Sequence, residues 1–163
     1  MHAAAHAYVA RLADARGPVG LVVEVGSLDI NGGVRGLWQA ETYVGVDVVP
    51  GPGVDVVADG ATYQAPGPVD VAVCCEVLEH TPHGAAIVAN LARQLTPGGW
   101  LVLTAAGPDR APHSAVDGGP LRPGEWYRNV TTAELWAYLL LAGLDVREVR
   151  DEGVDVQAWA VRA

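Results

Sequence analysis

Short apolar runs alternate along the chain with polar or glycine-containing breaks. Five such runs come before residue 106, at residues 20–25, 43–48, 54–58, 69–75 and 100–105. Their nearly continuous apolarity predicts strands that are covered on both faces, as in a parallel sheet. Two later runs, at residues 144–149 and 154–161, are close enough in sequence to form an antiparallel hairpin.

Helical patterns separate most of these runs. Residues 3–16 predict a helix that Gly17 and Pro18 end, and residues 33–40 and 85–95 predict two more. The segment between the third and fourth runs is too rich in proline for a full helix. The sequence Thr131-Thr132-Ala133-Glu134 is typical of a capping box that opens a helix reaching Gly143.

This order of elements predicts an α/β fold, a Rossmann-like three-layer sandwich. We expect a seven-stranded, mostly parallel sheet with one antiparallel strand in a C-terminal hairpin. The 163 residues suit a single domain, 1–163, with an N-terminal helical segment at 1–17. Residues 107–130 form an irregular segment of a length that is usually functional or mobile.

Composition narrows the classes of partner. The formal net charge is −9 and the ten basic residues are all arginines without a basic run, so we expect no nucleic-acid partner. No apolar run approaches the about 20 residues that span a bilayer, and the first residues lack a signal-peptide pattern. Cys74 and Cys75 are adjacent in an apolar run, which favours buried thiols over a disulfide framework. We therefore expect a cytoplasmic protein without a membrane anchor.

The stretch that follows the first run indicates a nucleoside-binding loop. The run ends at Glu24-Val25-Gly26 and breaks into a polar, glycine-containing turn. Gly26 allows a tight turn and a close approach of the backbone to a ligand. Asp47 ends the next strand, 23 residues beyond Glu24. We expect Asp47 to accept the hydroxyls of a ribose, and the alternative is a solvated loop acid.

This loop resembles motif I of the class I S-adenosylmethionine-dependent methyltransferases, which usually reads (D/E)-x-G-x-G-x-G. Glu24 and Gly26 match the motif, whereas Leu28 and Ile30 stand at its two later glycines. Four further segments resemble later motifs of the family in the right order, at residues 43–50 (YVGVDVVP), 58–60 (ADG), 69–80 (VDVAVCCEVLEH) and 95–103 (LTPGGWLVL). The E-x-L-E-H ending at residues 76–80 resembles the corresponding sequence in the small-molecule, type 11-like branch of this family.

The resemblance implies S-adenosylmethionine as the cofactor and methyl transfer to a small or medium-sized molecule. It implies that Glu24 orients the methionine ammonium group and that Asp59 meets the adenine amino group. The alternatives are a strand-end acid that caps backbone amides and an ordinary turn aspartate. Ser27, Asp29 and Asn31 occupy the same loop. The full set of expected cofactor contacts is Glu24, Gly26, Ser27, Asp47, Val48, Asp59, Gly60 and Glu76.

The candidate catalytic residues are His80, Glu76 and His113, and Glu79 follows the same strand. Imidazole has an ordinary pKa of about 6.5, so His80 needs little adjustment to accept a proton. Alternatively, His80 only packs and hydrogen-bonds at the base of the loop. His83 is a weaker candidate. Although Glu76 and these histidines are metal-ligating residue types, their spacing matches no standard zinc pattern, so we expect no metal.

The segment 107–130 is the expected substrate loop. It offers an acid, a base and aromatic rings in Asp109, Arg110, Trp126 and Tyr127, and alternatively the two aromatic residues cover the sheet edge. We expect a small-molecule substrate and a monomer or homodimer. A different class of function stays open: a non-catalytic nucleoside- or S-adenosylmethionine-binding module, or an interaction protein, with a methyltransferase-like fold.

Overall fold

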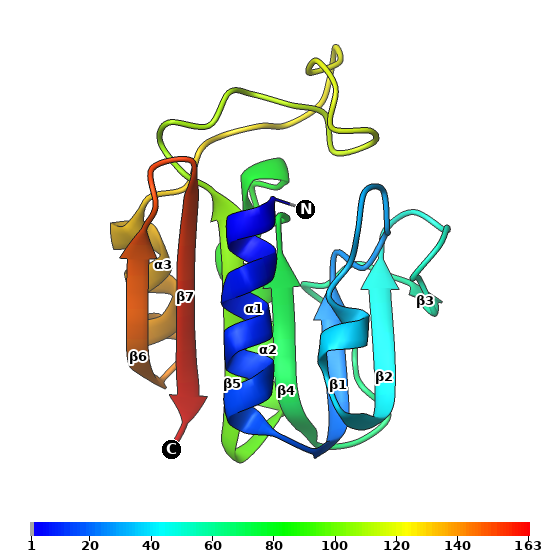
Figure 1. Cartoon of the computed structure of the whole chain (residues 1–163), viewed down its shortest axis with the longest axis vertical. Coiled ribbons are helices and arrows are strands. Elements are labelled where there is room, and N and C mark those ends of the chain that lie inside the picture. The colour runs from blue at the N-terminus through cyan, green and yellow to red at the C-terminus, as the bar shows by residue number, and fades with distance from the viewer. Residues whose placement is uncertain (1) are drawn as a thin grey trace.

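The computed structural model describes residues 2–163, so Met1, the first residue of the predicted segment 1–17, lies outside the described part. Its centre is a seven-stranded sheet in the order β3-β2-β1-β4-β5-β7-β6 (Figure 1). The strands are β1 (Val19–Val25), β2 (Ala40–Asp47), β3 (Val56–Val57), β4 (Val69–Cys75), β5 (Leu95–Ala106), β6 (Leu144–Asp151) and β7 (Asp155–Arg162).

The sheet is parallel except at β7. Strand β1 pairs in parallel with β2 and β4, and β4 pairs in parallel with β5. Strand β7 runs antiparallel to both β5 and β6, which confirms the predicted hairpin and its single reversed strand. The C-terminal ends of β1, β2, β4 and β5 therefore meet at one edge of the sheet, where the long segment 107–130 also lies (Figure 1).

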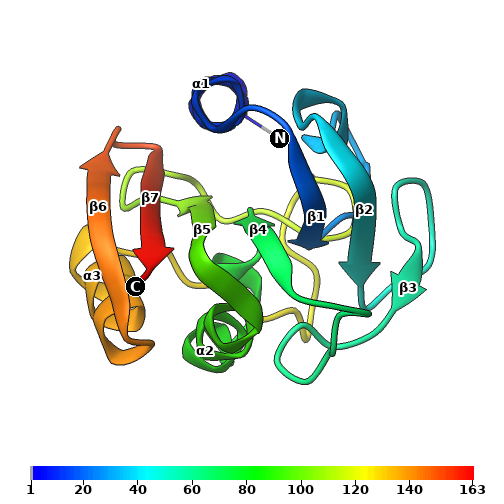
Figure 2. The same ribbon diagram turned by 90° about the horizontal axis from the view of Figure 1, so that it is seen from below.

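Helices cover both faces of the sheet. Helix α1 (Ala3–Arg16) lies on one face, and α2 (Gly84–Gln94) and α3 (Thr132–Leu141) lie on the other (Figure 2). Along β5, Val102 packs on the side of α1, whereas Leu101 and Leu103 pack on the side of α2 and α3. This double burial confirms the three-layer Rossmann-like prediction and explains why the strands are apolar throughout. None of the helices within residues 2–163 has the length and apolarity to cross a membrane.

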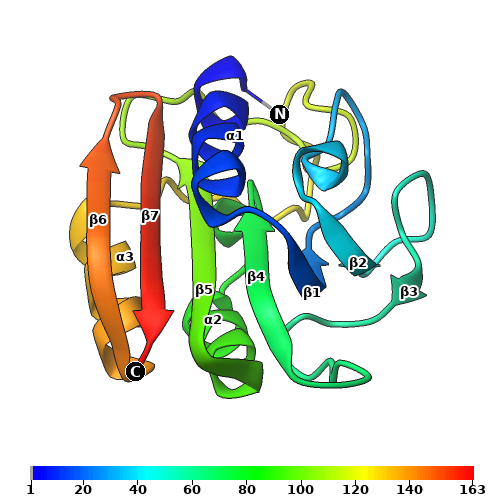
Figure 3. The ribbon, with the colours of Figure 1, turned by 60° about the horizontal axis from the view of Figure 1, so that its bottom comes forward.

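The predicted helix at residues 33–40 is wrong. This crossover holds only a 3-10 helix, η1 (Arg35–Leu37), beside α1, while α2 and α3 form full helices on the opposite face (Figure 3). Gly33 and Gly36 disfavour a helix, and Ala40 already belongs to β2. Val34 and Trp38 are nevertheless buried against α1, so the segment fills its part of the core without a full helix.

Two strand boundaries also differ from the pattern. The third strand shrinks to Val56–Val57: the Val54 N–H closes a turn on the Gly51 carbonyl before it, and the Ala58 N–H makes a last bond to the Asp47 carbonyl of β2. Strand β5 begins at Leu95, before the apolar run at residues 100–105, and its pairing with β4 shifts register between Val69 and Val71. The apolar pattern thus locates the strands better than it locates their ends.

The capping box of α3 is present and makes a testable contribution to stability. The Glu134 N–H donates to Oγ1 of Thr131 over 3.2 Å, and the Thr131 N–H donates to Oε2 of Glu134 over 3.0 Å. Thr131→Ala is expected to lower the free energy of unfolding by about 1 kcal/mol in urea denaturation, because a cap acceptor is lost. Thr131→Ser keeps the hydroxyl and should stay near wild type; equal stability of the two variants would contradict the assignment.

Candidate active site

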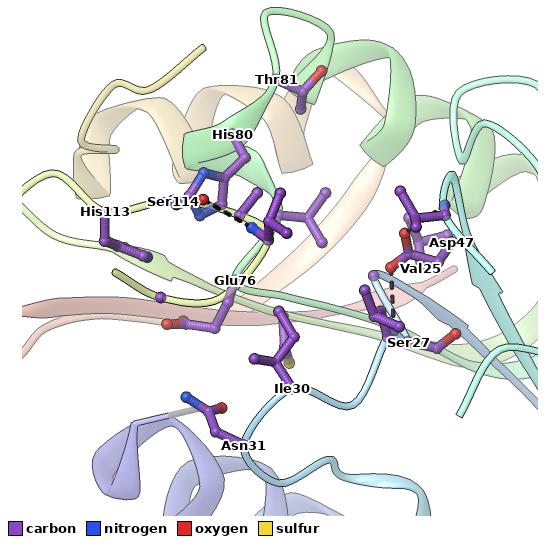
Figure 4. Close-up of a pocket in the computed structure, with 18 of the residues that line it drawn as sticks. Val25, Ser27, Ile30, Asn31, Asp47, Glu76, His80, Thr81, His113 and Ser114 are labelled. Atoms are coloured by element: carbon purple, nitrogen blue, oxygen red, sulfur yellow. Dashed lines mark hydrogen bonds between the residues drawn. The ribbon is translucent and has the colours of Figure 1, made fainter. Parts of the chain in front are cut away.

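A cavity of about 1060 Å³ opens at the C-terminal edge of the parallel strands. This is the edge at which ligands bind in open α/β sheets. Figure 4 shows the side chains of Asp47 and Ser27 on one side of the cavity and those of His80 and His113 on the other, with Ile30 between them. The lining comes from the C-terminal ends of β1, β2 and β4 and the loops after β1 to β4, from residues 109–116 and 118–120, and from His2, Ile87 and Val154.

Most of the residues expected from the sequence line this cavity. His83 does not: it is exposed at the N-terminal end of α2. Trp126 and Tyr127 also lie outside the lining; Trp126 is half-exposed, and Tyr127 packs against the rings of His80 and His113. The expected residues that do line the cavity are Glu24, Gly26, Ser27, Asp47, Val48, Asp59, Gly60, Glu76, His80, Asp109, Arg110 and His113.

Gly26 is held in a conformation that few other residues adopt. Its φ is +85°, and its N–H donates to the Val46 carbonyl over 2.9 Å. A Cβ atom built on Gly26 would overlap with Cγ2 of Val77. The loop after β1 can therefore turn at this position and pass close to the loop after β4 because residue 26 has no side chain.

Glycines after β2 compensate for the two glycines that motif I lacks. A Cβ atom on Gly51 would overlap with the Leu28 side chain, and one on Gly53 would overlap with the Ser27 carbonyl. The Asp29 N–H donates to the Pro52 carbonyl over 2.8 Å. The two loops thus pack directly on each other. Sequence reasoning missed this role, although the P-G-P-G run at residues 50–53 was its signal.

Asp47 joins the same two loops through its carboxylate. The Leu28 N–H donates to Oδ2 over 3.1 Å, and the Val49 N–H donates to Oδ1 over 3.0 Å. Each oxygen keeps further acceptor capacity, since a carboxylate has about four lone-pair sites. Val48 beside it exposes 67% of its surface and lines the cavity. The end of β2 therefore presents a fixed carboxylate next to an apolar surface.

Asp59 and Gly60 form a turn farther along the cavity. The Ala61 N–H donates to Oδ1 of Asp59 over 2.8 Å, and the Asn90 side chain donates to the Gly60 carbonyl over 2.9 Å. A Cβ atom on Gly60 would overlap with Val25. Asn90, in α2, is nearly fully buried, so the turn is tied to the helix layer below it.

Glu24 is buried, and its carboxylate accepts a hydrogen bond from the Tyr43 hydroxyl over 2.8 Å. Burial raises the pKa of Glu24 to about 7, although the Tyr43 hydrogen bond and the Arg35 charge oppose this. The Arg35 guanidinium lies 4.6 Å from the centre of the Tyr43 ring and also pairs with Asp55. Sequence reasoning missed Tyr43 and Arg35, because only the folded sheet brings them beside Glu24.

The raised pKa of Glu24 predicts a loss of stability with rising pH. The folded chain holds this proton more tightly than the unfolded chain, whose glutamate has an ordinary pKa of 4.5, so the free energy of unfolding should fall between pH 4.5 and about 7. The fall is on the order of 3 kcal/mol. Urea denaturation at pH 5 and pH 8 should show a fall in stability in wild type and in the exposed control Glu41→Gln. The fall should be smaller by this amount in Glu24→Gln, where Glu79 with its raised pKa still contributes. The same pH dependence in Glu24→Gln would refute the assignment.

Glu76 is fixed by two partners at the end of β4. Its φ is +58°, which is uncommon for a residue with a side chain. The Thr104 hydroxyl donates to Oε1 over 3.0 Å, and Arg110 donates to Oε2 over 2.8 Å. Arg110 also donates to the fully buried Asp155 over 2.6 Å. Arg110 is thus held between two carboxylates, and sequence reasoning missed Thr104 and Asp155 as their neighbours.

A second polar group surrounds His80. The ring of His80 lies 4.9 Å from that of His113 and 5.4 Å from that of Tyr127, centre to centre. Burial raises the pKa of Glu79 to about 8, and burial together with the His113 charge lowers the pKa of His80 to about 4. Two imidazole rings therefore line the end of the cavity opposite Asp47, and the buried carboxylate of Glu79 lies beside them.

Comparisons with known proteins agree with this architecture. The sequence profile of a family described as methyltransferase domain matches residues 2–149. The ubiquinone biosynthesis O-methyltransferase of Burkholderia thailandensis is 30% identical over 126 residues, which are 72% of this chain and 52% of that protein. The chain spans about half the length of the curated relatives that it matches.

Two solved structures show the same fold at low sequence identity. The 1,6-didemethyltoxoflavin-N1-methyltransferase of Burkholderia thailandensis, solved with bound 1,6-didemethyltoxoflavin and S-adenosylhomocysteine, gives a TM-score of 0.73 at 17% identity, over 98% of this chain and 79% of that one. The N-methyltransferase NodS of Bradyrhizobium japonicum with S-adenosylhomocysteine gives 0.66 at 17% identity, over 96% and 85%. With the profile match over most of the sequence, the chain belongs to the class I S-adenosylmethionine-dependent methyltransferase family and is type 11-like.

Proposed function

We propose that this chain binds S-adenosylmethionine in the cavity and transfers the methyl group to a small or medium-sized molecule. The observation that carries the proposal is the order of groups along the cavity. Asp47 stands at one end, His80 and His113 stand at the other, and the residues of the glycine loop lie between them (Figure 4). Such an order suits a nucleoside at one end and an acceptor at the other.

The residues present fit this cofactor. A side chain at Gly26 or Gly60 would overlap with Val77 or Val25, so both cavity-lining turns can follow their observed paths only with glycine. The hydroxyl of Ser27 is buried and has no hydrogen-bond partner among residues 2–163. Val48 offers an apolar surface for a purine ring, and the carboxylate of Asp47 can accept ribose hydroxyls. These features suit a nucleoside with a polar tail.

The charges of the lining favour a cation. Of the described residues that line the cavity, five are carboxylates and one is an arginine, which is already paired with Glu76 and Asp155. When bound, S-adenosylmethionine supplies a methyl group on a positively charged sulfur that an incoming nucleophile displaces in line. The carboxylates attract that charge and disfavour an anionic dinucleotide. In this proposal Glu24 holds the ammonium group, and Asp59 with Gly60 meets the adenine.

The acceptor side is proposed at His80 and His113. Methyl transfer depends mainly on alignment, so this chain's residues have to position the acceptor and exclude water. Residues 109–120 of the loop cover that end, which supports segment 107–130 as the substrate loop. Glu76 is hydrogen-bonded to Thr104 and Arg110. We therefore propose that Glu76 holds these neighbouring side chains in position and does not accept a proton from the acceptor. The relatives methylate oxygen or nitrogen, and we propose one of these as the acceptor atom.

Transfer of a labelled methyl group tests this function. The full chain, methyl-labelled S-adenosylmethionine and a panel of small phenols, catechols and heteroaromatic amines should yield labelled product together with an equal amount of S-adenosylhomocysteine. The Asp47→Ala variant serves as the control for contaminating enzymes, since it should lose turnover. Intact cofactor binding without product across the panel would instead favour the non-catalytic binding module.

We further propose that residues 1–163 act as one domain, in the cytoplasm, as a monomer or homodimer. The thiols of Cys74 and Cys75 are free and buried, which suits a reducing compartment. Size-exclusion chromatography with light scattering distinguishes the two assembly states.

A further inference from the structure

Glu79 is fully buried beside His80 and His113, and these two histidines line the cavity at the end opposite Asp47. Each of the three side chains offers one ligand atom, and these atoms all lie within 4.8 Å of one another. Glu79 and His80 belong to the 3-10 helix η2 (Leu78–His80), whereas His113 comes from the long loop. We propose that these three side chains form a binding site for a divalent transition-metal ion, with zinc as the preferred ion.

Two buried atoms in this group have no partner. The Glu79 side chain is fully buried; its Oε1 accepts the Ala106 N–H over 3.1 Å, but its Oε2 has no hydrogen bond within residues 2–163. Nδ1 of His80 is also buried without a partner in the same described range. Leaving such buried polar groups without a partner costs free energy of folding. A cation held between them removes this cost for both groups at once.

Neighbouring cationic side chains are already engaged. Arg110 donates to Glu76 and Asp155, and Arg128 pairs with Glu134 at the start of α3. The Arg128 backbone N–H donates to the Glu79 carbonyl, so this arginine fixes the backbone of the site while its guanidinium points to α3. The unpaired carboxylate oxygen of Glu79 therefore has no arginine as its counter-ion among these neighbours.

The orientation of His113 suits a metal ligand. Its Nδ1 lies 3.2 Å from the Ala111 carbonyl, so Nδ1 carries a proton toward that oxygen and leaves Nε2 with a free lone pair. A metal-binding histidine generally donates a hydrogen bond from the N–H of its other ring nitrogen, which fixes the tautomer and the direction of the ring. Glu79 is oriented in a similar way: the Ala106 N–H donates to one carboxylate oxygen, and the other oxygen stays available to a metal ion.

The set of donors favours zinc. Two imidazoles and one carboxylate, with an open fourth position, are a common arrangement in catalytic zinc sites. Ligand atoms around tetrahedral zinc lie about 3.3 Å apart, given bonds of about 2.0–2.1 Å, so the three side chains have to close by up to about 1.5 Å. His80 and His113 line the cavity, and the open position therefore faces it. The expectation of no metal failed to consider Glu79, whose burial becomes evident only in the fold.

An ion at this place has a direct use in the proposed reaction. As a Lewis acid it favours the deprotonated form of an acceptor hydroxyl and orients it, and it ties the long loop to η2. In that case His80 serves as a ligand and not as a proton acceptor. This catalytic use rests on the proposed methyl transfer, whereas metal binding itself does not.

Cobalt titration tests the site on the full chain, purified without a polyhistidine tag and stripped with a chelator. We expect one Co²⁺ per chain with a visible absorption band typical of nitrogen and oxygen ligands, and displacement of the band by Zn²⁺. Glu79→Gln and His113→Ala each remove a proposed ligand and should weaken Co²⁺ binding by at least about 10-fold, the loss that removal of an outer-shell partner already causes. His6→Ala, an exposed histidine on α1, should bind like wild type. Thermal melts monitored by circular dichroism establish that the variants fold.

The absence of the absorption band in wild type, or equal Co²⁺ affinity in Glu79→Gln, His113→Ala and wild type, would overturn the proposal. Calorimetry with S-adenosylhomocysteine on the same metal-free samples separates this result from a failure of the proposed function. Cofactor binding without Co²⁺ binding refutes only the metal site, and Co²⁺ binding without cofactor binding refutes only the methyltransferase proposal.

Discussion

Gly26→Ala is expected to lower the free energy of unfolding by about 2–5 kcal/mol and to weaken S-adenosylhomocysteine binding more than tenfold. The positive φ of Gly26 costs a residue with a side chain about 1–2 kcal/mol. The overlap of the new methyl group with Val77 adds about 1–3 kcal/mol, as overpacking does in a well-packed core. The displaced loop also carries the expected cofactor contacts, so urea denaturation and calorimetry should both show the change.

Two matched variants separate backbone strain from overlap. Gly32 also has a positive φ, of +107°, but a Cβ atom there would have no neighbour within 4 Å. Gly32→Ala should therefore lower the free energy of unfolding only by the cost of the positive φ. Adding Val77→Ala to Gly26→Ala should restore part of the lost stability, because it removes the overlapping methyl group. If Gly32→Ala proves as destabilising as Gly26→Ala, close approach of the two loops is not the reason for the glycine.

Asp47→Ala is expected to weaken the binding of S-adenosylmethionine and S-adenosylhomocysteine by at least tenfold, which corresponds to about 1.4 kcal/mol or more. The carboxylate is oriented by the Leu28 and Val49 N–H groups, so its remaining lone pairs have fixed directions. The substitution removes both the acceptor for the ribose and the link between the loops after β1 and β2. Isothermal titration calorimetry measures the loss.

The controls for Asp47 separate hydrogen bonding from charge. Asp47→Asn keeps the shape and one carbonyl acceptor, so its affinity should lie between those of wild type and Asp47→Ala. Asp14→Ala removes an exposed carboxylate from α1 and should leave binding unchanged. An unchanged affinity in Asp47→Ala would refute the ribose assignment.

The fold was largely predictable because burial on both faces produces long apolar runs. The runs at 69–75 and 144–149 locate β4 and β6, and the closely spaced last two runs predict the reversed strand. The helix predicted at 33–40 failed because Gly33 and Gly36 disfavour a helix and Ala40 already belongs to β2, although Val34 and Trp38 are buried in this crossover. Local patterns predict which residues are buried more reliably than they predict the backbone conformation of those residues.

The candidate site was predictable where it depends on strand ends. Glu24, Asp47 and Glu76 follow or end neighbouring parallel strands, and the sheet brings such positions to one edge. Contacts between distant elements were not predictable. Tyr43 reaches Glu24 from the next strand, and Asp155 reaches Arg110 from the reversed strand. No spacing within the sequence records these contacts.

The most direct test of the account is calorimetric titration of the full chain with S-adenosylmethionine and S-adenosylhomocysteine, beside NAD⁺ as a control. The account predicts one site per chain for both sulfur compounds and no binding of NAD⁺, whose pyrophosphate meets a cavity lined by carboxylates. Failure to bind either sulfur compound, or binding of NAD⁺ with equal affinity, would contradict it.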